Sequence, residues 1–167
     1  LWGLLCVHQC AQPRDWEDLM LACPSQAEAI REVRVQLTRS VFQHPVNPYE
    51  CYLLEQLEQD SLRRLYLTLQ TTSRQQQLTA ADSPPELPDA WIRFWQRFQS
   101  DQQIFWTTIA RRQGLFSLYS APVEVGSALS PIWAKQPVVL VGSALDQEAE
   151  APIYRQWIGL DDLTCLK

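Results

Sequence analysis

The chain has 167 residues, a mass of 19.3 kDa and a formal net charge of −5 at pH 7. Its 46% of hydrophobic and 20% of charged residues exclude a wholly disordered chain, and the acidic balance argues against non-specific nucleic-acid binding over the whole surface. No apolar run reaches the roughly 18 residues of a membrane-spanning helix, and five glycines leave little material for a Gly-rich phosphate loop.

Two helices are predicted in the first third of the chain. Pro13 suits the first turn of a short helix that Pro24 stops. Ser25 and Glu28 have the spacing of a capping box that starts a second helix, whose apolar face ends near the two prolines of 44–48.

Two further helices are predicted around a linker. The third helix runs from about Tyr49 to Gln70, and the Gln-, Ser-, Thr- and Pro-rich stretch 71–88 is expected to be a mobile connection. The fourth helix runs from Asp89 to a glycine stop at Gly114, because aromatic residues recur at helical spacing from Trp91 onward.

The residue pattern changes after Gly114. A strand over 115–125, a short helix over 128–134, a buried strand over 137–145, a helix over 148–158 and a strand from 163 are expected. The predicted fold is therefore mainly α with a small α/β C-terminal part. Residues 1–113 are expected to form a helical insertion, and 114–167 part of an α/β core with a parallel sheet.

Five cysteines form no CxxC pair, which favours buried free thiols and a reducing, cytoplasmic location. Cys6, His8 and Cys10 could share one face of a strand, but no fourth ligand for a metal is suggested. His44 precedes a proline, which is typical of a surface or capping residue. Phosphate loops of the GxxxxGK[ST] and GxGxxG types are missing, as are the HExxH and GxSxG motifs, so no catalytic residue is predicted.

The C-terminal third resembles a known family. Its strand, short helix with a tryptophan, buried strand and final helix resemble the return into the first motor domain of DinG/XPD-type DNA helicases, and several runs resemble a divergent cyanobacterial branch of them. The segments that carry the resemblance are Phe116–Val125, Leu129–Trp133, Val138–Leu145 and Tyr154–Leu160. It implies a segment of a longer protein that hydrolyses ATP with Mg²⁺ and moves on single-stranded DNA. The chain starts at Leu1 rather than methionine, which fits that expectation.

The resemblance also points to site residues. Gly142, Ser143 and Ala144 fall where these helicases have a T-S-A-T-L sequence that couples ATP hydrolysis to DNA movement, and both threonines are replaced. Coupling in the longer protein is therefore expected to be altered. A helical arch would contact DNA through cations and aromatic side chains.

The candidates for backbone contacts are Arg93, Arg97, Arg111 and Arg112. Trp91, Trp95 and Trp106 are stacking candidates if exposed, although their helical spacing favours packing in the core.

Two alternatives remain open. Residues 1–16 resemble a late strand of phytochrome-type GAF domains, in which His8 would line a bilin pocket, so a non-catalytic sensor or interaction module is the second hypothesis. A helical scaffold without a ligand is the third.

Overall fold

The computed structural model describes residues 7–79 and 87–135. They belong to two compact units: one is His8–Ser120, and the other includes Val7 and residues 121–135. The expected strand over 137–145, helix over 148–158 and strand from 163 lie outside the described residues.

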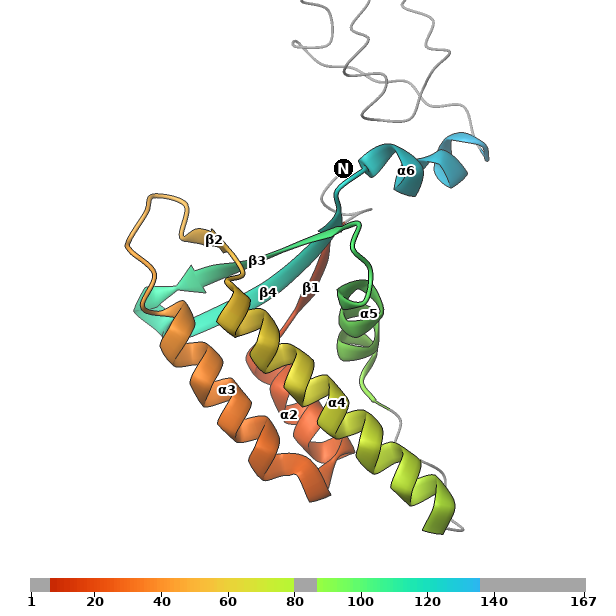
Figure 1. The fold of residues 1–167 in the computed structure, drawn as a ribbon. Helices are drawn as coiled ribbons and strands as arrows, with labels where there is room; N and C mark the ends of the chain where they lie inside the picture. The colour runs from red at the N-terminus through yellow and green to blue at the C-terminus, as the bar shows by residue number, and fades with distance from the viewer. Residues whose placement is uncertain (1–6, 80–86, 136–167) are drawn as a thin grey trace, which may run out of the picture. The chain divides into compact units, whose positions relative to one another are not determined.

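The larger unit is built on a four-stranded sheet (Figure 1). Its strands are β1 (His8–Cys10), β2 (Cys51–Leu53), β3 (Gln103–Ala110) and β4 (Leu115–Pro122), in the order β1-β4-β3-β2. Both outer pairs are antiparallel, with Gln9 opposite Tyr119 and Tyr52 opposite Thr107. A tight turn joins β3 to β4, and a connection that short can only join antiparallel strands.

The sheet overturns the predicted fold class. We expected a helical segment over 1–113 followed by a parallel sheet, but the sheet is antiparallel and three of its strands lie within 1–113. The predicted helix from Asp89 to Gly114 is wrong in its second half. Helix α5 spans only Asp89–Phe98, and β3 occupies Gln103–Ala110.

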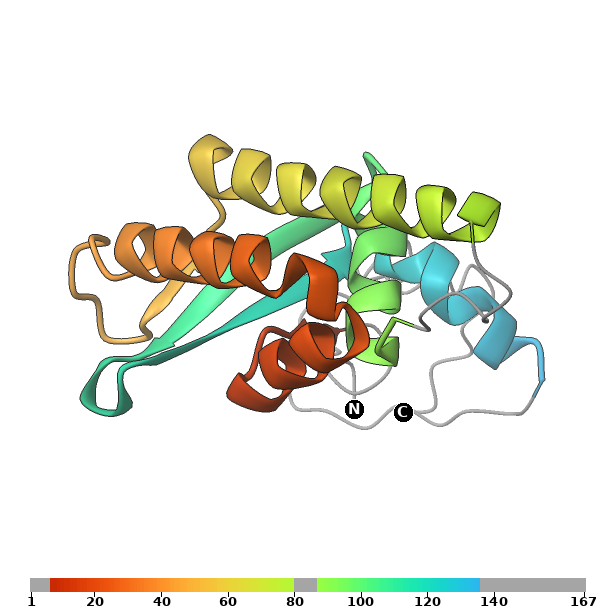
Figure 2. The same cartoon turned by 90° about the horizontal axis from the view of Figure 1, so that it is seen from below.

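Four helices cover one face of this sheet (Figures 1 and 2). They are α2 (Pro13–Ala22), α3 (Ala27–Val41), α4 (Gln56–Thr79) and α5, with a 3₁₀ turn, η1 (Pro24–Gln26), between α2 and α3. Helix α3 packs against both α2 and α4. Helix α4 continues nine residues beyond Gln70, into the stretch that was predicted to be a mobile linker.

The hydrophobic core lies between the helices and the sheet. Trp91 lies at the centre of this core. The Trp91 ring packs edge-on against the ring of Trp16, with centroids 4.6 Å apart, and stacks on the ring of Trp95, with centroids 4.9 Å apart. Its indole N–H donates to the Asp15 carbonyl over 2.7 Å, so the buried polar atom is satisfied. The other fully buried large side chains of this unit are Phe94, Leu19, Ile30, Leu37, Leu62, Leu65, Leu69 and Leu118.

The described part of the second unit contains one helix, α6 (Val125–Trp133). Leu129 on this helix is fully buried, and Ser127 Oγ donates to the Glu124 carbonyl at its start. The short helix was predicted over 128–134, so its position is close to the expectation. Among the residues that the structure describes, no helix combines the length and apolar character needed to cross a bilayer.

Candidate nucleic-acid interface

The two predicted arginines of α5 have different environments. Arg93 is exposed and lies 3.7 Å from Asp89, one turn earlier on the helix. Arg97 is partly buried and donates to the Ser120 carbonyl on β4 over 3.2 Å. Arg93 is therefore accessible to a polyanion, whereas Arg97 links α5 to the sheet.

The other two predicted arginines lie on the β3–β4 turn, η2 (Arg111–Gln113), rather than on a helix. Arg111 Nε donates to both carboxylate oxygens of Glu50 at 2.8 and 3.0 Å, and its terminal nitrogens donate to the carbonyls of Phe42 and His44. Its hydrogen bond with Tyr52 and the neighbouring Glu50 carboxylate raise the pKa of Arg111. Arg111 thus ties the turn to the segment after α3, while the neighbouring Arg112 is exposed.

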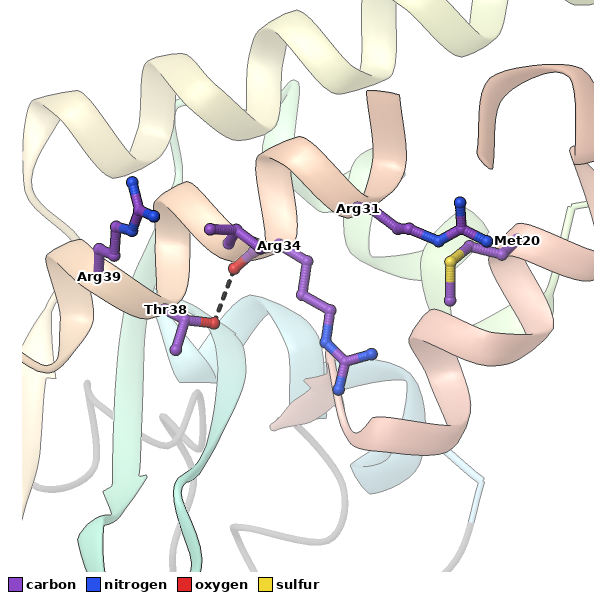
Figure 3. A pocket seen from close by; sticks show the side chains of 6 residues that line it. Met20, Arg31, Arg34, Thr38 and Arg39 are labelled. Carbon is purple, nitrogen blue, oxygen red and sulfur yellow. Dashed lines mark hydrogen bonds between the residues drawn. The ribbon is translucent and has the colours of Figure 1, made fainter. Parts of the chain in front are cut away.

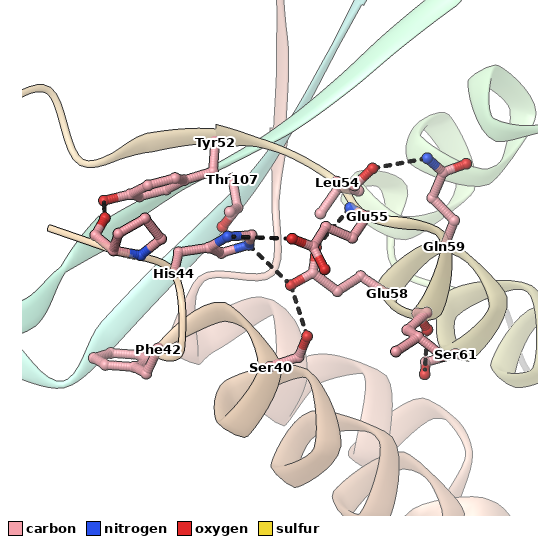
Figure 4. Close-up of polar contacts among 12 residues, drawn as sticks. Ser40, Phe42, His44, Tyr52, Leu54, Glu55, Glu58, Gln59, Ser61 and Thr107 are labelled. Atoms are coloured by element: carbon pink, nitrogen blue, oxygen red, sulfur yellow. Dashed lines mark hydrogen bonds and ion pairs between the residues drawn. The ribbon is translucent and has the colours of Figure 1, made fainter. Parts of the chain in front are cut away.

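The buried carboxylate of Glu58 lies beside His44 (Figure 4). Glu58 at the start of α4 is fully buried and accepts the Ser40 hydroxyl at 3.0 Å and the Glu55 backbone N–H at 2.9 Å. His44 Nε2 lies 3.3 Å from Glu58 Oε1, an ion-pair distance without hydrogen-bond alignment. Ser40, His44 and the N-terminus of α4 therefore meet at one carboxylate.

The imidazole of His44 completes the network. Its ring stacks on Tyr52 with centroids 4.6 Å apart, and Nδ1 lies 3.7 Å from the exposed carboxylate of Glu55. The His44 side chain is only 9% exposed and the Glu58 carboxylate is inaccessible, so the pair is almost closed to solvent. A His–Glu pair can transfer protons in general, but here it joins the α3–α4 connection to the sheet. The prediction of a surface or capping role for His44 did not anticipate this burial.

Sequence reasoning missed a groove along α3 (Figure 3). Its volume is about 520 Å³, and the lining residues are Met20 from α2 and Arg31, Arg34, Val35, Thr38 and Arg39 from α3. Three cations line the groove, and none of the carboxylates in the described part of the chain does.

Arg31 is paired with Glu28 at 2.9 Å, whereas no ion pair or hydrogen bond of the Arg34 or Arg39 guanidinium is found within residues 7–79 and 87–135. The visible signal in the sequence was three arginines within nine residues.

The three tryptophans considered for base stacking differ in burial. Trp91 and Trp95 are buried, which confirms the prediction that they pack in the core. Trp106 is half-buried and stacks on Tyr119 of β4, with centroids 5.5 Å apart and rings 10° from parallel. Both point to the side of the sheet opposite Thr107 and Leu118, whose side chains are buried.

His8 and the cysteines were considered as pocket or metal residues in the sequence analysis. His8 Nε2 lies 2.8 Å from the Ala90 carbonyl, so this ring nitrogen is engaged within the fold. Cys10 and Cys23 are buried and Cys51 is exposed, all as free thiols. No group of residues suited to a metal ion occurs in the described part of the chain. Gly142, Ser143 and Ala144 lie outside the described residues.

Comparison with known proteins yields no family. No protein-family model matches the chain, and no curated protein or solved structure shows significant similarity to it. Function must therefore be argued from this chain's own residues.

Proposed function

We propose that this chain is a non-catalytic, DNA-contacting segment of a longer ATP-dependent helicase of the DinG/XPD type. The ATP and Mg²⁺ sites and the other helicase domains would lie in the remainder of that protein. Its substrate would be single-stranded DNA, and the proposal places the protein in the cytoplasm.

The observation that carries the proposal is the resemblance of residues 116–160 to these helicases. Two parts of that stretch fall within the described residues, as the strand β4 and the short helix α6, which ends at Trp133. Strand β4 belongs to an antiparallel sheet, so the proposal rests on the residue pattern and not on a parallel motor sheet. The replacement of both threonines at 141–145 leads us to expect weak coupling between ATP hydrolysis and DNA movement.

Among the sequence-predicted arginines, exposure favours two as DNA contacts. Arg93 and Arg112 have accessible guanidinium groups, whereas Arg111 has its donors committed to Glu50 and two carbonyls. We therefore assign Arg111 a structural role and propose Arg93 and Arg112 for the phosphate contacts.

The test uses the complete gene product that contains this segment. We expect a GxxxxGK[ST] motif on the N-terminal side, binding of ATP, and ATP hydrolysis that rises when single-stranded DNA is added. The chain by itself is the matched control and should hydrolyse no ATP. A complete product that binds neither ATP nor single-stranded DNA would refute the proposal.

A further inference from the structure

The side chains around the α3 groove are arranged by the helix itself. At about 100° per residue, Arg31, Val35 and Thr38 fall within about 60° of one another and form one stripe. Arg34 then lies on one side of this stripe and Arg39 on the other. Figure 3 shows these two arginines pointing in opposite directions from α3, with Arg31 extending toward Met20. The uncharged floor of Val35 and Thr38 is thus flanked by cations.

The local charge differs from that of the whole chain. The acidic residues of α3 are Glu28, which pairs with Arg31, and Glu32, and neither lines the groove. Arg14 and Asp18 on α2 pair with each other. Arg34 and Arg39 therefore keep an uncompensated positive charge within the described surface, on a protein whose net charge is −5.

The dimensions and chemistry of the groove indicate its ligand. Arg31 and Arg39 are eight residues apart, which is about 12 Å along the helix axis. A single strand carries one negative charge per nucleotide, so a groove of this length meets more than one phosphate. Arginine forms bidentate bonds with phosphate oxygens, and an apolar floor suits the faces of sugars.

We propose that the α2–α3 groove binds the sugar–phosphate backbone of single-stranded nucleic acid through Arg34 and Arg39, with Val35 and Thr38 beneath the strand. This inference rests on the proposed function and adds the surface through which the chain holds its DNA. Thr38 Oγ1 already donates to the Arg34 carbonyl over 2.7 Å, so its hydroxyl proton is used within the helix.

Binding can be measured by fluorescence anisotropy, with the whole 167-residue chain and a labelled oligothymidylate of about 20 nucleotides. Each phosphate contact on a single strand contributes about 0.7 to the slope of log K against log salt. Replacing both arginines (R34Q/R39Q) should therefore lower this slope by about 1.4. At about 0.1 M salt the same two contacts correspond to about a 25-fold loss of affinity.

The matched control is R14Q/R63Q, which removes the same charge from two exposed arginines outside the groove. Its affinity should fall by less than about threefold, because distant charges are screened at this salt concentration. The charge-conserving variant R34K/R39K should keep the wild-type slope. Circular dichroism of every variant should match that of the wild type, since neither arginine is buried.

Two results would overturn the inference: an equal loss of affinity in R34Q/R39Q and R14Q/R63Q, or no oligothymidylate binding by the wild-type chain. Both leave the proposed function standing if the complete gene product still binds ATP and shows DNA-stimulated hydrolysis. Conversely, a complete product that does not bind ATP would refute the helicase proposal, while oligothymidylate binding by the groove could still be measured.

Discussion

Replacement of Glu58 by alanine should destabilise the protein more than any other change of a single acidic residue among those described. The carboxylate is fully buried and accepts hydrogen bonds from the Ser40 hydroxyl and the Glu55 backbone N–H. It also lies 3.3 Å from His44 Nε2. Glu58→Ala removes the acceptor of the Ser40 hydroxyl and of the Glu55 N–H, and it removes the carboxylate beside the His44 ring.

The magnitude follows from those contacts. A hydrogen bond to a charged acceptor contributes about 1.5–3 kcal/mol, and truncating one member of a buried charged network costs about 3–5 kcal/mol. We therefore expect Glu58→Ala to lower the free energy of unfolding by about 4 kcal/mol. Glu58→Gln keeps the shape and one acceptor oxygen, and should lose about half as much.

Urea unfolding followed by circular dichroism measures the loss. Glu55→Gln is the matched control, because Glu55 also faces His44, at 3.7 Å, but its side chain is 63% exposed. An exposed pair of this kind contributes less than about 1 kcal/mol. The reasoning fails if Glu58→Ala costs no more than Glu55→Gln at equal m-value.

Three further predictions concern the turn and the thiols. Arg111→Gln should lower the urea midpoint clearly, because it removes the bonds to Glu50 and two carbonyls, whereas Arg112→Gln should leave the midpoint near the wild-type value. Gly114→Ala should lower the free energy of unfolding by about 1 kcal/mol in the same assay. The backbone φ of Gly114 is +65° and no atom lies within 4 Å of the added Cβ, so the loss comes from the backbone conformation alone. A larger loss would indicate a steric clash and contradict this geometry. Because burial raises the pKa of Cys10, its thiolate fraction at about pH 8 is lower than that of a free cysteine, and native alkylation followed by peptide mass spectrometry should label the exposed Cys51 and spare Cys10; labelling at equal rates would contradict the burial of Cys10.

Helical periodicity in the sequence predicted the core faces of several elements. Ile30, Leu37 and Val41 are buried on α3, and Trp91 and Trp95 are buried on α5, as their spacing indicates. Such faces are local properties, because residues three and four apart lie on one side of a helix wherever that helix packs.

The strand expected over 115–125 is confirmed as β4, whereas strands β2 and β3 were missed because their local signals are weak or ambiguous. Phe105, Thr107 and Ile109 alternate toward the helices in β3, but their aromatic and aliphatic neighbours also continue the helical spacing that begins at Trp91. The deciding feature is the break after Phe98, at the polar residues 99–102. Strand β2 has only three residues, and its pairing with β3 is a contact between distant parts of the chain.

The capping box predicted at the start of the second helix is not formed. Ser25 and Glu28 have capping-box spacing, yet Ser25 lies in η1 and α3 begins at Ala27 without a side-chain cap. At α4 the carboxylate of Glu58 instead reaches back to the N–H of Glu55, whose own side chain is not a usual capping residue.

The candidate groove depends on tertiary placement as well. The sequence shows Arg34 and Arg39 on one helix, but not that no acidic side chain from α2 lines the space beside them. Arg111 illustrates the opposite case: it was a candidate for phosphate contact, and folding commits its donors to Glu50 and to backbone carbonyls.

The most direct test of the central claim is photocross-linking of the complete gene product to a single strand that carries 5-bromodeoxyuridine, followed by mapping of the cross-linked peptides. If this chain is the DNA-contacting segment of a helicase, cross-links should appear in the peptides that contain Met20 and helix α3, and R34Q/R39Q should abolish them. Cross-links confined to other parts of the gene product, with none between residues 7 and 135, would contradict the account.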